Sequence, residues 1–231
     1  MSNRFKSRYD DDINLFEGRW HLAQYALLVA LLLAAPWLLG TYYLGELTAV
    51  LIWSLAGLGL MLISGHTGQV SLGHAAFMAI GAFTNLALMM RGWHFIPALL
   101  ASAVTSGVLG AIISRPILRM SGIYLAIATL ALSIIIEDVS IIAEPITGGV
   151  AGLFAPPIDM FGLKIDRYTS PAAFYYLCLT VLVIVTLGYL NLLRSASGRS
   201  FLAVRDSEVS ARALGVNVAR AKTLSFALSC A

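Results

Sequence analysis

The sequence predicts an all-α protein, a polytopic transmembrane helical bundle that contains a broken or re-entrant segment. Of its 231 residues, 59% are hydrophobic and 12% are charged, and the mean hydropathy is +0.84. A soluble domain carries about twice this share of charge, and the apolar residues here fall in runs long enough to cross a bilayer. Both observations exclude a soluble globular protein. A polar, glycine-rich stretch within one apolar run predicts the broken segment.

Six apolar runs predict six membrane spans, because a helix needs about 20 residues to cross ~30 Å of hydrocarbon. The tail before them, residues 1–19, carries several acidic residues, so we expect an uncleaved first span rather than a signal peptide. A seventh run starts near Thr223 and reaches only ~14 Å. We therefore expect the transmembrane domain, residues 20–231, to be truncated at its C-terminus. The predicted spans are residues 20–40, 47–64, 69–90, 95–114, 122–143 and 171–193.

Basic residues predict the orientation of these spans. With the N-terminus inside, only Arg91, Lys164 and Arg167 of the 15 Lys and Arg residues fall on the outer side, as the positive-inside rule requires. The same partition makes residues 144–170 an outer loop and residues 194–222 an inner loop. These long connections are where function is expected. The predicted inner basic residues are Arg4, Lys6, Arg8, Arg19, Arg115, Arg119, Arg194, Arg199, Arg205, Arg212, Arg220 and Lys222.

Small residues recur at every fourth position of the fourth span. They share one helix face and predict that another helix packs closely against it. A polar path along the serines is the weaker alternative, because a buried Ser can bond to its own helix backbone. The stripe consists of Ala98, Ser102, Ser106, Gly110 and Ser114.

The stretch SGHTGQVSLGHAAFMAIGAF, residues 64–83, combines glycines with polar side chains where a span is expected. Irregular backbone at membrane depth is tolerated only where protein or a water-filled cavity covers it. In transporters such breaks supply free N–H and C=O groups that hold substrate. An inner loop followed by an ordinary helix is the alternative. The candidate substrate pathway consists of Gly68, Gln69, Ser71, Gly73, His74 and Phe77.

Other chemistry has little support in the sequence. His66 and His74 are eight residues apart with no Cys or carboxylate between them, so we expect no metal site. Phosphate-binding loops, nucleophile elbows and zinc-protease motifs are absent from the sequence, so we expect no enzyme activity and no cofactor. A net charge of +3 with dispersed basic residues predicts no nucleic-acid partner. Glu137 and Asp138, the only carboxylates in the predicted spans, fall near the outer interface, which argues against a proton-coupled carrier.

The inner loop predicts a short interfacial helix followed by a second helix that ends at a glycine. Asp206 or Ser207 can cap the start of the second helix, and Glu208 suits its positive end. Gly215 can take the left-handed position that closes it. Its basic residues can face lipid headgroups, or the helix can bind a cytoplasmic partner, and composition leaves both open.

Four ordered motifs resemble the branched-chain amino acid ABC transporter permeases, specifically the second of their two permease subunits. The resemblance extends from about Leu47 to the end of the chain. It implies a multi-pass subunit of the bacterial inner membrane, with a cytoplasmic N-terminus, that moves branched-chain amino acids inward. It also implies a homologous permease subunit, two cytoplasmic ATPase subunits and a periplasmic substrate-binding protein as partners. The motifs are GHTGQVSLGHAAFMAIGAF, RMSGIYLAIATLAL, TGGVAGL and GRSFLAVRDSEVSARALGVNVARAKTLSFALS.

The resemblance also implies site residues. In the inner loop, the positions that match the ATPase-coupling helix are Glu208, Ala211, Ala213 and Gly215. In the outer loop, the matching substrate-pathway positions are Thr147, Gly148 and Gly149. This chain has Ala151 where the family usually has Asp or Asn before Gly152.

Three alternatives to this function remain open. Related permeases carry urea, short amides or aromatic acids. A gradient-driven secondary carrier would need a titrating acid such as Glu137. A purely structural membrane anchor would tolerate substitution of the polar stretch.

Overall fold

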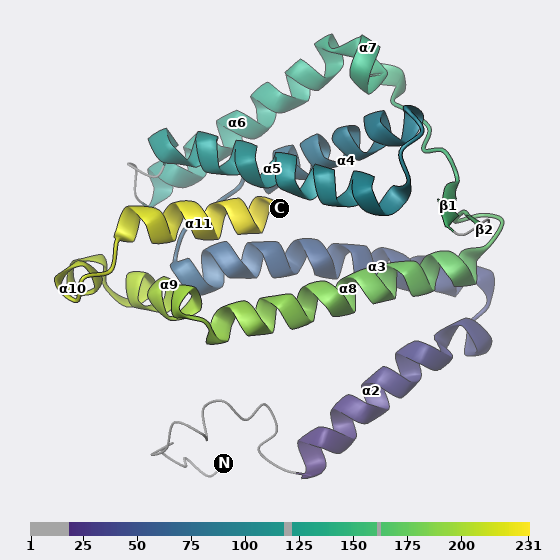
Figure 1. The fold of residues 1–231 in the computed structure, drawn as a ribbon, viewed down its shortest axis with the longest axis horizontal. Helices are drawn as coiled ribbons and strands as arrows, with labels where there is room; N and C mark the ends of the chain where they lie inside the picture. The colour runs from purple at the N-terminus through teal and green to yellow at the C-terminus, as the bar shows by residue number, and fades with distance from the viewer. Residues whose placement is uncertain (1–18, 118–121, 161–162) are drawn as a thin grey trace.

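The computed structural model describes residues 19–117, 122–160 and 163–231, and it confirms an all-α bundle (Figure 1). Its long helices are α2 (Arg19–Leu38), α3 (Thr41–Leu60), α4 (His74–Met90), α5 (Phe95–Ile117), α6 (Ile123–Ile142), α8 (Pro171–Arg194) and α11 (Val218–Cys230). The shorter ones are the π-helix η1 (Met61–Gly65), α7 (Glu144–Thr147), the 3₁₀ helix η2 (Gly149–Ala151), α9 (Ala196–Asp206) and α10 (Glu208–Ala213). Strands β1 (Ile158–Met160) and β2 (Leu163–Ile165) form an antiparallel hairpin.

Each of the six predicted spans contains a helix. Within residues 19–117, 122–160 and 163–231, four helical segments are long and apolar enough to cross a membrane, namely Thr41–Gly65, Phe95–Pro116, Ile123–Ile142 and Pro171–Arg194. Two apolar helices in the described residues are shorter, Ala23–Leu38 and His74–Met90.

Two predicted boundaries are wrong, and both matter for function. Helix α3 begins at Thr41 rather than Leu47, so Glu46 lies inside this apolar helix and the expectation that only Glu137 and Asp138 are intramembrane carboxylates fails. Helix α4 begins at His74 rather than Gln69, because the five residues before it are not helical. The break predicted in this stretch is therefore present.

Helix α11 lies between two pairs of helices, α3 with α8 and α4 with α5 (Figure 1). The predicted seventh run starts earlier than Thr223, because the Asn217 side chain caps α11 by accepting from the backbone N–H of Arg220 at 3.0 Å. Tyr175 of α8 is fully buried against α3 and donates to the carbonyl of Leu32 in α2 at 2.9 Å. This bond ties the divergent helix α2 to the bundle.

The small-residue stripe on α5 packs as predicted, since its five members are all buried. A Cβ added at Gly110 would lie 2.8 Å from Sγ of Cys230, so α11 approaches the α5 backbone closely. The hydroxyl groups of Ser102 and Ser114 bond to carbonyls of their own helix at 2.8 and 2.9 Å. The stripe is a packing surface for α11 and α4.

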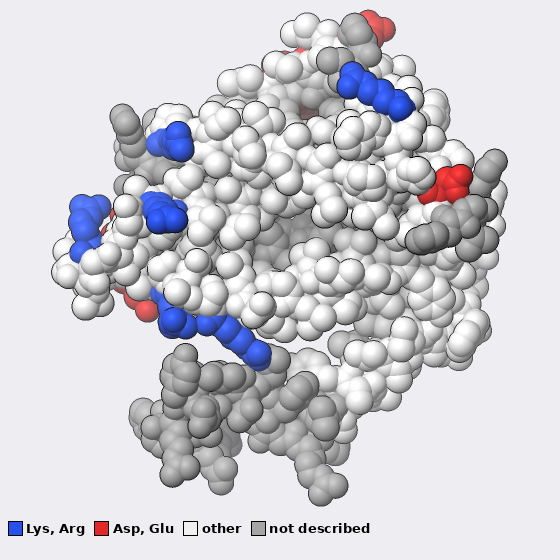
Figure 2. Space-filling model, viewed as in Figure 1, with Lys and Arg blue, Asp and Glu red and all other residues white. Residues whose placement is uncertain are grey.

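The two ends of the bundle differ in charge. Lys and Arg gather at the end that carries α9 and α10, at the left of the view, whereas the hairpin and the α4–α5 turn occupy the opposite end (Figures 1 and 2). Arg91 and Arg167 belong to the hairpin end. Arg4, Lys6, Arg8 and Arg119 lie outside the described residues, as does most of the N-terminal tail.

Candidate functional site

The backbone between η1 and α4 forms a non-helical polar segment, residues 68–73, just after the candidate span Thr41–Gly65. Gly68 enters it with φ +68°, a left-handed conformation that glycine adopts without strain. The N–H of Gln69 donates to the carbonyl of Ile63 at 3.0 Å. The N–H of Leu72 donates to the hydroxyl of Thr129 in α6, also at 3.0 Å. These bonds satisfy backbone groups that a helix would otherwise satisfy.

Gly73 closes the segment through a steric contact with α6. A Cβ at this position would collide with the backbone carbonyl of Thr129. Because the obstacle is backbone rather than a flexible side chain, no other residue fits without moving α6. The segment is therefore held in place by shape as well as by hydrogen bonds.

Gln69 of the segment and His74, the first residue of α4, both bond to α11. The Gln69 amide Nε2 donates to the Ser225 hydroxyl at 3.0 Å, and Gln69 is only 3% exposed. His74 Nε2 lies 2.6 Å from the Ser229 hydroxyl, which itself donates to the carbonyl of Gly59 in α3. Because the Ser229 hydroxyl donates its hydrogen to Gly59, it must accept from His74. The network therefore assigns the ring proton of His74 to Nε2.

That assignment leaves the other ring nitrogen of His74 as an acceptor. The Ser71 hydroxyl lies 3.2 Å from it and donates. Phe77 of α4 and Phe226 of α11 meet edge to face, with ring centroids 5.6 Å apart. This pair packs beside the His74 ring and covers the network on its apolar side.

One buried hydrogen-bond acceptor in the segment has no partner among the described residues. Among the described residues, the side-chain oxygen of Gln69 is buried without a hydrogen-bond partner. Such an atom is costly unless water or a ligand reaches it. Gln69 is therefore the member of the predicted pathway with spare hydrogen-bonding capacity.

A cavity of about 340 Å³ adjoins the segment between α3, α4, α5 and α11. Of the predicted pathway residues, His74 and Phe77 line it, together with Ser106 and Ser229. Gln69 and Ser71 are hydrogen-bonded behind this wall. The sequence predicts that all of these residues line one path. In the structure, His74 and Phe77 line the cavity, whereas Gln69 and Ser71 do not.

The second predicted pathway group lies elsewhere. Thr147 is buried at the far end of α6, where its hydroxyl donates to Ser140 and Ala143 carbonyls at 2.5 and 2.9 Å. Gly148 and Gly149 follow with φ of +74° and +57°. This tight turn contacts the end of α4 away from His74. The structure does not bring the two predicted groups together.

The predicted inner helix is present as α10. The Ser207 hydroxyl caps its start by accepting from the N–H of Ser210 at 3.2 Å, which resolves the choice between Ser207 and Asp206. Gly215 follows the helix with φ +83°, the left-handed position expected of it. Ala211 is buried against Phe201 of α9. Ala213 and Glu208 are exposed.

Helix α11 connects α10 to the polar segment. Lys222 of α11 forms an ion pair with Glu208 of α10 at 2.6 Å. Ser225 and Ser229 follow at positions three and seven residues later, which puts all three on one face of the helix. The same face of a single helix therefore binds α10 at one end and Gln69 and His74 at the other.

Arg205 of α9 makes a second connection. One of its terminal nitrogens donates to the carbonyl of Gly65, the last residue of η1, at 3.0 Å. A Cβ at Gly68 would lie 3.2 Å from Cγ of Arg205, so the segment begins against this side chain. Arg205 also pairs with Asp206 at 3.1 Å. The predicted inner loop thus touches the segment directly.

Sequence reasoning missed the residues on α11. Lys222 was counted only as a basic residue, and Ser225 and Ser229 were not singled out, because their partners lie more than 150 positions away in the chain. The only local signal is their spacing of four, which places two hydroxyls on one helix face.

An apolar helical bundle with a polar, non-helical segment between two of its helices is an arrangement found in membrane transport proteins. Residues 42–231 match the family model described as "Branched-chain amino acid transport system / permease component". The chain therefore belongs to the family of branched-chain amino acid transport system permease components.

Two curated relatives agree with this family. The chain is 32% identical over 227 residues to the high-affinity branched-chain amino acid transport system permease protein LivM of Salmonella typhimurium, covering 88% of this chain and 53% of that protein. It is 32% identical over 231 residues to the protein of the same name from Escherichia coli K12, covering 88% and 54%. The chain spans about half the length of these relatives. No solved structure matches it significantly.

Proposed function

We propose that the chain is the transmembrane permease subunit of an ABC importer that moves branched-chain amino acids from a periplasmic binding protein into the cytoplasm. It lies in the bacterial inner membrane, with its N-terminus and the α9–α10 end on the cytoplasmic side. A homologous permease subunit pairs with it, and two separate ATPase subunits hydrolyse ATP. Family membership and the names of both relatives support this function.

The observation that carries the proposal is that one helix, α11, bonds both to α10 and to the polar segment. A displacement of α10 would pull on Lys222 through Glu208, and the same helix holds Gln69 through Ser225 at 3.0 Å. An ATPase can act on a membrane pathway only through such a contact, since the permease has no phosphate-binding loop of its own. Helix α11 would transmit that movement to the segment.

Helix α10 has the surface that a docking helix needs. Val209 and Leu214 are each 81% exposed, although both are apolar. The buried Ala211 fixes the opposite face on the bundle. Each of the proposed coupling residues then has its own role. Glu208 transmits the displacement of α10 to Lys222, and the small side chains of Ala211 and Ala213 let other surfaces approach the helix closely. Gly215 turns the chain back toward α11.

In this proposal the two pathway groups act at different depths. The turn of Thr147, Gly148 and Gly149 contributes at the outer end. The segment contributes at the inner half, where His74 and Phe77 line the 340 Å³ cavity and Gly68, Gln69, Ser71 and Gly73 support them. Alternating access would open the cavity to one side at a time.

Pull-down of the ATPase with the importer purified from its own cells tests the proposal. Replacing Val209 and Leu214 with Asp adds charge to an exposed apolar face without removing a bond inside the chain. We expect the ATPase to be lost while the permease pair remains. A matched control is Val150→Asp, which alters a side chain that is 89% exposed at the other end. Retention of the ATPase by the Val209 and Leu214 variant would refute the docking role.

The rival class is a gradient-driven carrier, and its acid would be Glu137. Glu137 is exposed near the outer end of α6 rather than buried at the centre of the bundle. Leucine uptake into proteoliposomes distinguishes the two classes. We expect uptake to need ATP inside and to survive Glu137→Gln. Uptake driven by a proton gradient without ATP would favour the carrier.

Labelling of single cysteines tests the orientation, in a background where Cys178 and Cys230 are replaced by Ala. A Cys at position 205 should be shielded from an impermeant thiol reagent in intact cells, and a Cys at position 164 should be labelled. The reverse pattern would invert the proposed topology.

A further inference from the structure

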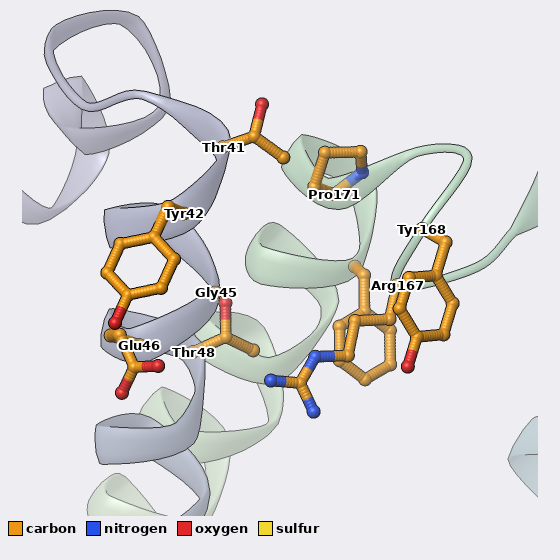
Figure 3. A pocket seen from close by; sticks show the side chains of 9 residues that line it. Thr41, Tyr42, Gly45, Glu46, Thr48, Arg167, Tyr168 and Pro171 are labelled. Carbon is orange, nitrogen blue, oxygen red and sulfur yellow. The ribbon is translucent and has the colours of Figure 1, made fainter.

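A second pocket lies at the hairpin end of the bundle, far from the polar segment. It has a volume of about 280 Å³ and is bounded by the first turns of α3 and by the chain that leads into α8 (Figure 3). Along α3, Glu46 in this pocket is 13 residues, or ~20 Å, from Gly59 beside the segment. None of the pathway or coupling residues lines it.

Two opposite charges face each other across this pocket. The carboxylate of Glu46 projects from α3, and the guanidinium of Arg167 projects toward it from the loop before α8 (Figure 3). Within the described part of the chain, neither forms an ion pair or a side-chain hydrogen bond. Both side chains are exposed, so their charged groups are accessible to a ligand.

Three of the nine residues that line the pocket are aromatic. Tyr42 of α3, Tyr168 of the loop and Phe174 of α8 line it. The hydroxyl of Thr48, deeper in the pocket, is already bonded to the carbonyl of Leu44 at 2.7 Å. Glu46 and Arg167 supply the charged groups of the pocket, beside the hydroxyl groups of Thr41, Tyr42 and Tyr168.

We propose that this pocket binds a small zwitterion, a molecule that carries an ammonium and an acidic group a few ångströms apart. Glu46 binds the ammonium and Arg167 binds the carboxylate or phosphate, which its planar fork suits. The aromatic walls accept an apolar side chain or the faces of the ammonium group. Two opposite charges held apart across a pocket match such a ligand better than an anion or a cation alone.

Two sources supply this chemistry at a membrane surface. One is a free neutral amino acid, and the other is the headgroup of an ethanolamine phospholipid. The proposal does not rest on transport by this chain, because either ligand would bind whether or not the protein is an importer.

Binding to the purified chain tests the proposal with leucine as the free probe. Equilibrium dialysis compares leucine with N-acetyl-leucine, which lacks the ammonium, and with leucinamide, which lacks the carboxylate. Native mass spectrometry counts bound phosphatidylethanolamine after reconstitution with equal parts of phosphatidylethanolamine and phosphatidylglycerol. If the free amino acid is the ligand, each modified probe should bind about tenfold more weakly than leucine. If the lipid is the ligand, phosphatidylethanolamine should be retained over phosphatidylglycerol.

Three variants connect the bound molecule to this pocket. Glu46→Gln and Arg167→Gln should each weaken binding of the retained ligand about tenfold. The charge exchange Glu46→Arg with Arg167→Glu should restore part of that loss, because a zwitterion can bind in the reversed orientation. Asp138→Asn, at the same end of the bundle but outside the pocket, is the control and should bind like the native chain.

Two results would overturn the proposal. One is binding of leucine or phosphatidylethanolamine that neither single variant weakens, which would place the ligand elsewhere. The other is absence of both ligands from the folded native chain. Because neither assay involves ATP or uptake, failure here and failure of the importer function are distinguishable.

Discussion

The two groups of the proposed substrate pathway are held by different kinds of contact. The polar segment and the start of α4 are held by long-range bonds, because Gln69 and His74 bond to Ser225 and Ser229, more than 150 positions away in the chain. Among the described residues, the Thr147 side chain bonds only to groups within seven positions of itself. Long-range bonds transmit displacement between elements, whereas local bonds keep a turn in shape. We therefore expect the polar segment, rather than the Thr147 turn, to respond to a displacement of α10.

The largest expected effect is at Gly73, where the segment meets α6. Gly73→Ala would drive a Cβ into the Thr129 carbonyl and should cost about 3 kcal/mol or prevent folding. The matched control is Gly57→Ala in α3, where a Cβ meets nothing within 4 Å and helix propensity improves by about 1 kcal/mol. Thermal unfolding in detergent measures both. Equal unfolding temperatures for the two variants would contradict the close approach.

The next effect is at Ser229, which bridges His74 and Gly59. Ser229→Ala removes the bonds to the partly buried His74 and to the Gly59 carbonyl and should destabilise the chain by about 1 kcal/mol. Ser54→Ala is the control, because Ser54 is exposed and bonds only within its own helix at 2.7 Å. A chemical denaturation series gives the difference, and equal losses would show that the bridge adds nothing.

A smaller effect is expected for the ion pair between Glu208 and Lys222. The Lys222 side chain is 12% exposed and that of Glu208 is 45% exposed, so screening limits the coupling energy to about 0.5–1 kcal/mol. A double-mutant cycle with Glu208→Gln and Lys222→Met measures it. The coupling should shrink as salt is raised. A coupling of zero at low salt would remove this connection between α10 and α11.

The smallest effect on global stability is expected at Thr147. Thr147→Val removes its local bonds and should change global unfolding by less than about 0.5 kcal/mol, because the turn opens separately from the core. Amide exchange should nevertheless rise at residues 148–152. Loss of the whole fold in this variant would contradict the view that the bonds of Thr147 stabilise only its own turn.

Much of the fold could be predicted from the sequence, because hydropathy and length alone locate the spans. The α5 stripe and the Ser207 and Gly215 ends of α10 were also predictable, since each depends on residues within one helix or turn. The start of α3 was not predicted, because Thr41 to Glu46 is more polar than the run that follows. Packing of α3 against α8 extends the helix through this stretch.

The candidate site was predicted only as a segment. Gly68 and Gly73 predict the break in the helix. The hydrogen-bond partners of Gln69 and His74 depend on where α11 packs, which the local sequence pattern does not specify. The pocket of Glu46 and Arg167 was missed for the same reason, because these residues are 121 positions apart and meet only when α3 and α8 are side by side.

Amide hydrogen exchange in the Glu208→Lys variant tests most directly whether α11 connects α10 to the polar segment. The variant sets two positive charges against each other, so α11 should loosen and exchange at Gln69 and Leu72 should rise about fivefold or more. Exchange at residues 148–152 should stay at the native rate, and adding Lys222→Glu should restore protection of the segment. Unchanged exchange at Gln69 and Leu72, with α10 itself disturbed, would contradict the connection.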